Sequence, residues 1–101
     1  MAKKEEFILE KECMKTINYA TNVVKEIKEE VNEGVIKDCM IPTLCNIKTG
    51  ETTGFAVVLT LSTKYDYTNT ILDAWKERLC ADEYLITSAR NQLKVRFNVR
   101  Y

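Results

Sequence analysis

The sequence YLITSARNQLKVRFNVRY, residues 84–101, predicts two β-strands joined by a tight turn. Residues 84–89 and 93–101 are rich in β-branched and aromatic side chains, and a tight turn is expected between them at Arg90-Asn91. The second strand alternates strictly, which is typical of a strand with one buried face. Its apolar positions are Leu93, Val95, Phe97, Val99 and Tyr101, and the positions expected to face outward are Lys94, Arg96, Asn98 and Arg100.

Positive charge gathers on this hairpin. Residues 84–101 hold four basic residues and no acidic residue. The rest of the chain is slightly acidic: residues 1–34 hold six Lys and eight Glu, and residues 35–83 hold five basic and seven acidic residues. The whole chain is neutral, with 15 residues of each sign, so no long-range field attracts a polyanion. The candidate binding residues here are Lys94, Arg96, Arg100 and Arg90.

Three interpretations of the basic face remain open. Alternate residues of a strand lie about 6.6 Å apart, which suits phosphates along a nucleic acid. The aromatic residues that stack bases are expected on the opposite face, however, which favours a protein partner of acidic character over nucleic acid. The third interpretation is that the charges only solvate the face and discourage aggregation.

The segment before the hairpin predicts a helix. Ile71, Leu72, Trp75 and Leu79 recur at helical spacing, Asp66 or Thr68 can cap the start, and the helix should end near Cys80. Tyr65 and Tyr67 lie in the loop before it and form a second candidate partner surface, because tyrosine is enriched at protein interfaces.

Residues 35–62 predict two further strands. Residues 35–47 read as one strand whose apolar face is Val35, Cys39, Ile41, Cys45 and Ile47. Pro42 has no N–H to donate, so this strand should lie at an edge or contain a bulge. Residues 48–54 read as a hairpin loop, and residues 55–62 are apolar on both faces, as in a central strand.

The first segment predicts a long helix with an apolar stripe. Its stripe runs through Cys13, Ile17, Ala20, Val24, Ile27 and Val31, with Phe7–Leu9 favoured as the first turn and Gly34 as the residue that closes the helix. The stripe can lie on the protein's own sheet, or it can contact a second subunit as a heptad seam does. We expect a homodimer whose self-association residues are Ile17, Ala20, Val24, Ile27 and Val31.

Together these elements predict one α+β domain over residues 1–101, in the order α-β-β-α-β-β. The most economical architecture is a four-stranded, mainly antiparallel sheet with both helices on one face.

Catalytic and metal chemistry find little support in the composition. The chain has no histidine, and it contains no phosphate-binding loop, nucleophile elbow or metal-ligand spacing. Cys13, Cys39, Cys45 and Cys80 are too widely spaced for a typical zinc site and are expected to be reduced and buried. We expect no enzyme activity, cofactor or metal. Because no secretory signal and no membrane-spanning segment is found, a cytoplasmic location without membrane contact is expected.

The prediction that follows is a non-enzymatic protein-interaction module that acts by occupying a partner's surface. Adaptors and inhibitors encoded by phages and mobile elements are small, motif-free proteins of this kind. Two alternatives stay open: a nucleic-acid-binding protein that uses the basic C-terminal hairpin, and a protein that sequesters a small molecule in a pocket between subunits.

Overall fold

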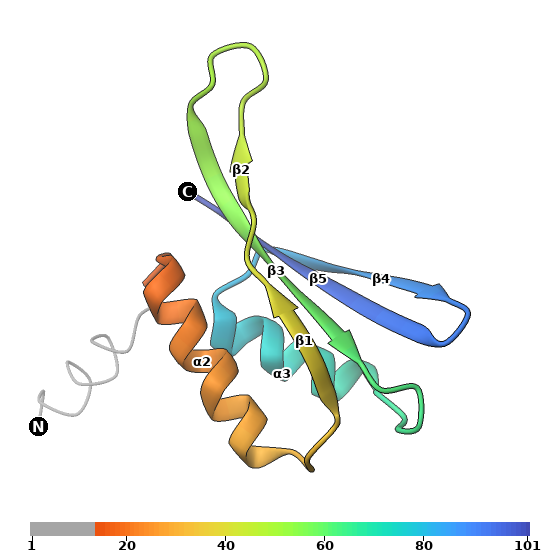
Figure 1. Cartoon of the computed structure of the whole chain (residues 1–101). Helices are drawn as coiled ribbons and strands as arrows, with labels where there is room; N and C mark the ends of the chain where they lie inside the picture. The colour runs from red at the N-terminus through yellow and green to blue at the C-terminus, as the bar shows by residue number, and fades with distance from the viewer. Residues whose placement is uncertain (1–13) are drawn as a thin grey trace, which may run out of the picture.

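The computed structural model describes residues 14–101, which form an α+β domain with two helices and a five-stranded antiparallel sheet. Figure 1 shows both helices on the same side of the sheet. The elements in chain order are α2 Ile17–Glu30, β1 Ile36–Met40, β2 Thr43–Cys45, β3 Thr52–Leu61, α3 Asn69–Leu79, β4 Glu83–Ala89 and β5 Gln92–Arg100. The strand order is β1-β3-β5-β4, and β2 pairs with the first residues of β3. Phe7–Leu9 and Cys13, which the sequence assigned to the first helix, lie outside the described residues.

The sheet has five strands rather than the predicted four because the chain breaks at Pro42. Residues 35–47 form two short strands, β1 and β2, with Pro42 between them. The Pro42 carbonyl oxygen accepts a hydrogen bond from the Ala56 backbone N–H at 2.9 Å, which keeps the interrupted chain against β3. Ile47 was predicted on the buried face but lies in the turn after β2 and is 98% exposed. Cys45 is also exposed, because the apolar face does not continue past the break.

Strand β3 lies at the centre of the sheet, as its two apolar faces predict. It pairs with β1 and β2 on one side and with β5 on the other. One face of β3 is packed under the helices, and that side of the sheet holds the hydrophobic core. The core side chains on the strands are Ile36, Phe55, Val57, Leu59, Leu61, Val95, Phe97 and Val99, and those on α3 are Leu72, Trp75 and Leu79.

The apolar stripe of α2 packs on the protein's own sheet. Ala20, Val24 and Ile27 are buried in the core, together with Val23. They are covered within one chain and could reach a second copy only if α2 left the core. Ile17 is exposed and Val31 is partly buried, so the ends of the stripe remain nearer the surface. Self-association itself stays a prediction.

The helix termini differ from the prediction at α2 and agree with it at α3. Helix α2 ends at Glu30, and Val31 is already extended, so Gly34 does not close the helix. Gly34 has a φ of 89° and belongs to the turn that leads to β1. Thr68 caps α3 by accepting from the Ile71 N–H, and Cys80 ends it in the left-handed conformation. Ile71, predicted on the buried side, is exposed.

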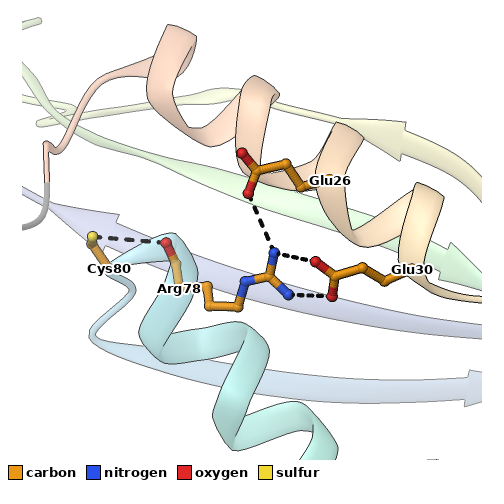
Figure 2. Close-up of polar contacts among 4 residues, drawn as sticks. All are labelled: Glu26, Glu30, Arg78 and Cys80. Carbon is orange, nitrogen blue, oxygen red and sulfur yellow. Dashed lines mark hydrogen bonds and ion pairs between the residues drawn. The ribbon is translucent and has the colours of Figure 1, made fainter. Parts of the chain in front are cut away.

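The cysteines correct one expectation. Cys39 and Cys45 are free thiols, but Cys80 is disulfide-bonded. Figure 2 shows the Cys80 Sγ atom 3.9 Å from the Arg78 carbonyl oxygen. We regard this as a contact rather than a hydrogen bond, because a disulfide sulfur carries no proton to donate. Neither α2 nor α3 has the length and hydropathy that a membrane-crossing helix needs.

Candidate binding surface

Among the described residues, the face of the sheet away from the two helices carries no helix (Figure 1), and we call it the open face. Residues opposite each other on neighbouring antiparallel strands share a face, so the register shows which side chains lie there. The register gives two rows that cross all four main strands. The central row is Met40, Val58, Arg96 and Leu85, and the adjacent row is Asp38, Thr60, Lys94 and Thr87.

The central row is unusually apolar for a face in water. Met40 and Leu85, at its two ends, are 56% and 55% exposed. Val58 and Arg96 lie between them and are half-buried. Since neighbouring strands are about 4.8 Å apart, the four side chains form a continuous strip about 15 Å long. An antiparallel sheet that faces only water normally carries polar residues on that side.

A hydrogen-bonded polar cluster borders this strip. The Arg96 Nε atom donates to Asn98 Oδ1 at 3.0 Å, and the Asn98 Nδ2 atom donates to Glu83 Oε2 at 2.8 Å. The same Glu83 oxygen accepts from Arg100 Nη2 at 2.7 Å. The hydrogen bond from Arg100 and then that from Asn98 lower the pKa of Glu83, because both stabilise its carboxylate. This cluster fixes the Arg96 side chain, which lies in the central row between Val58 and Leu85.

The structure divides the predicted basic face into three parts. Lys94 and Arg96 lie two residues apart on β5, both on the open face. Arg100 is neutralised by Glu83 at the far end of the strand. Arg90 lies at the tip of the β4–β5 hairpin with a φ of 50°. The hairpin is therefore less basic than residues 84–101 alone indicate.

The acids that offset this charge precede the basic segment directly. Glu83 lies opposite Asn98 in the hairpin, and an oxygen of Asp82 accepts from the Arg100 backbone N–H at 2.8 Å. The sequence alone did not predict that Asp82 and Glu83 contact Arg100. It also did not predict that Met40, Val58 and Leu85 lie in one row with Arg96. The signal for the acids was available, because a two-residue turn at 90–91 pairs position 83 with position 98.

The two candidate tyrosines have different surroundings. The Tyr67 hydroxyl donates to the Ser62 carbonyl oxygen at 2.9 Å, and its ring lies 6.4 Å from that of Trp75. Burial raises the pKa of Tyr67. Tyr67 therefore fixes its own loop to α3. Tyr65 is more exposed and borders a shallow hollow of about 250 Å³ between this loop and the end of α2.

The described residues offer no obvious reactive group. Burial raises the pKa of the Cys39 thiol, which disfavours the nucleophilic thiolate. Within residues 14–101, no three His, Cys, Asp or Glu side chains are grouped so that they could hold a metal ion.

No protein-family model, curated protein or solved structure matches this chain. Function has to be inferred from the surface chemistry of the chain itself.

Proposed function

We propose that the protein is a non-enzymatic protein-binding module whose open face docks against the surface of a partner. The observation that carries this proposal is the central row, in which Arg96 lies between Val58 and Leu85, and Met40 extends the row beyond Val58. Methionine and arginine are enriched at protein interfaces, and arginine is a frequent hot-spot residue. Burying the exposed ends of this row against a partner removes apolar area from water, which stabilises the complex.

The charge of the open face favours an acidic partner. Within residues 14–101, Lys94 makes no ion pair, and the guanidinium of Arg96 contacts the neutral side chain of Asn98 rather than a carboxylate. Asp38, at the β1 end of the row that holds Lys94, is the one acid in the two rows, so their net charge is positive. This charge around an apolar centre suits a partner that presents carboxylates. Such complementarity raises the association rate and selects among partners.

The test compares capture of partners from an extract of the native host by three forms of the protein. The three forms are the wild type, a double variant and a control. The double variant combines Met40→Asp and Lys94→Glu, each of which changes an exposed open-face side chain outside the core. We expect the double variant to lose at least about tenfold in affinity for a partner that the wild type retains. Lys25→Glu, the same charge reversal on exposed α2, should bind that partner as the wild type does.

Matched melting temperatures would show that the three forms are equally folded. Equal capture by all three forms would contradict the proposal, because the open face would then not be the docking surface.

Nucleic acid remains the second candidate, since Lys94 and Arg96 are alternate residues of one strand. Against it, Arg100 is paired with Glu83, and no residue in either row of the open face is aromatic. Two phosphate contacts would give a slope of log affinity against log salt of only about −1.4 to −1.8. Tight binding of a random oligonucleotide with a steeper salt dependence would replace our proposal with this one.

A further inference from the structure

The two edges of the sheet are protected very differently. An exposed edge strand presents unpaired N–H and C=O groups, and natural proteins guard such edges with charges, proline, bulges or short strands. The edge formed by β1 and β2 has all four kinds of protection, and its strands are only five and three residues long. It carries Lys37 and Asp38, it is broken at Pro42, and its register with β3 shifts in both strands.

The opposite edge, β4, has none of this protection after its first residue, Glu83. It pairs with β5 in an unbroken register over seven residues. From Tyr84 to Ala89 it contains no charged residue and no proline. Leu85 on the open face and Ile86 on the helix face are 55% and 50% exposed. The sheet order ends at β4, so within residues 14–101 no strand covers its outer side.

We propose that β4 pairs antiparallel with β4 of a second copy of this chain, so that one sheet runs through a two-fold dimer. The charges at the two ends of the strand favour this occupant. Asp82 and Glu83 precede the uncharged run and Arg90 follows it. Antiparallel self-pairing places each copy's acidic end beside the other copy's Arg90, whereas parallel pairing would place like charges together.

The length of the strand also determines the register. Full overlap of Glu83–Ala89 with itself centres the pair on Ile86, its fourth residue. The two Ile86 side chains then lie directly opposite each other, and Leu85 lies opposite Thr87 of the second copy. Because paired residues share a face, the helices of both copies lie on the same side of the continuous sheet. Pairing removes both Ile86 side chains from water, where a single chain leaves them half exposed.

This surface differs from the α2 stripe, which is already buried in each chain. It meets the proposed docking surface only at Leu85, which lies on β4 and also belongs to the central row of the open face. Met40 and Lys94 lie on other strands than β4, so Met40→Asp and Lys94→Glu should leave the dimer unchanged. Capture retained by the double variant would therefore contradict the docking proposal alone, whereas a monomeric wild type would contradict the β4 proposal alone.

Charge substitutions at Ile86 test the register directly, with sedimentation equilibrium on the full chain as the measurement. Ile86→Lys and Ile86→Glu each place two like charges opposite each other and should weaken the dimer about tenfold or more. Mixing the two variants should restore association as a heterodimer, which native mass spectrometry identifies by mass, because unlike charges then face each other. Ile47→Lys is the matched control and should dimerise as the wild type does, since Ile47 is 98% exposed in a distant turn.

Three results would overturn the proposal. The wild type could remain monomeric at high micromolar concentration, Ile86→Lys could dimerise as tightly as the wild type, or the mixed variants could fail to associate. Concentration-dependent protection of backbone amides in residues 84–89 from hydrogen exchange should accompany the dimer, and its absence would also count against β4.

Discussion

At Gly54, strands β3 and β5 approach more closely than any side chain would allow. Gly54 lies opposite Arg100 and has a φ of 155°. A Cβ atom there would lie 2.1 Å from the Val99 carbonyl oxygen and 2.9 Å from the Arg100 Cα atom. Both are backbone atoms that cannot rotate away, so glycine is required at this position. Gly50, in the hairpin turn, has a φ of 76° but no atom within 4 Å of its Cβ position.

Alanine substitutions separate these two effects. Gly54→Ala combines an unfavourable φ with a backbone collision and should reduce the free energy of unfolding by about 2–4 kcal/mol. Gly50→Ala meets only the unfavourable φ and should cost about 1 kcal/mol. Urea denaturation of the two variants measures the difference. Equal losses would show that the close approach at Gly54 does not constrain the sheet.

At the scale of elements, two kinds of contact join α2 to the rest of the domain. Arg78 of α3 reaches across to Glu30 at 2.7 Å and to Glu26 at 3.3 Å, as Figure 2 shows. The hydrogen bond from Arg78 lowers the pKa of Glu30, but both glutamates are mostly exposed, and exposed ion pairs contribute little. Ile27 of α2 is fully buried in the core. Burial of the apolar stripe, rather than the ion pairs, should therefore hold α2 in place.

Single substitutions can rank these contributions. Ile27→Ala leaves a cavity in the core and should reduce the free energy of unfolding by about 2–5 kcal/mol. Arg78→Gln removes both ion pairs and should cost less than about 1 kcal/mol. Thermal denaturation at several protein concentrations gives both values and shows whether Ile27 acts within one chain. A mild effect of Ile27→Ala that depends on concentration would instead place the stripe between subunits.

The elements themselves were largely predictable, because periodicity and turn residues act locally. The turn at Arg90-Asn91 gives the register of the whole β4–β5 hairpin, including Glu83 opposite Asn98. The charge of that hairpin was overestimated because residues were counted by segment and not by cross-strand pair. Ile47 and Ile71 were misplaced for another reason. Their apolar character fits the local pattern, but the chain break at Pro42 and the extent of the core leave them in water.

At the scale of the whole molecule, the central row of the open face joins residues that are far apart in the sequence. Met40, Val58, Leu85 and Arg96 come from four strands and meet only because the order is β1-β3-β5-β4. The β4–β5 pairing follows from a short turn, but the pairing of β3 with β5 spans α3 and leaves no local signal. The basic half of the candidate site could therefore be predicted from the sequence, whereas its apolar half could not.

Oxidation of two methionines tests most directly whether the open face is the docking surface. Met40 on the open face and Met14 before α2 are 56% and 59% exposed, so dilute peroxide should oxidise them at similar rates in the isolated protein. Mass spectrometry can follow both residues in the isolated protein and in the complex with its captured partner. We expect the partner to slow oxidation of Met40 severalfold while Met14 reacts as before. Protection of Met14 alone, or unchanged oxidation of both residues in the complex, would contradict the account.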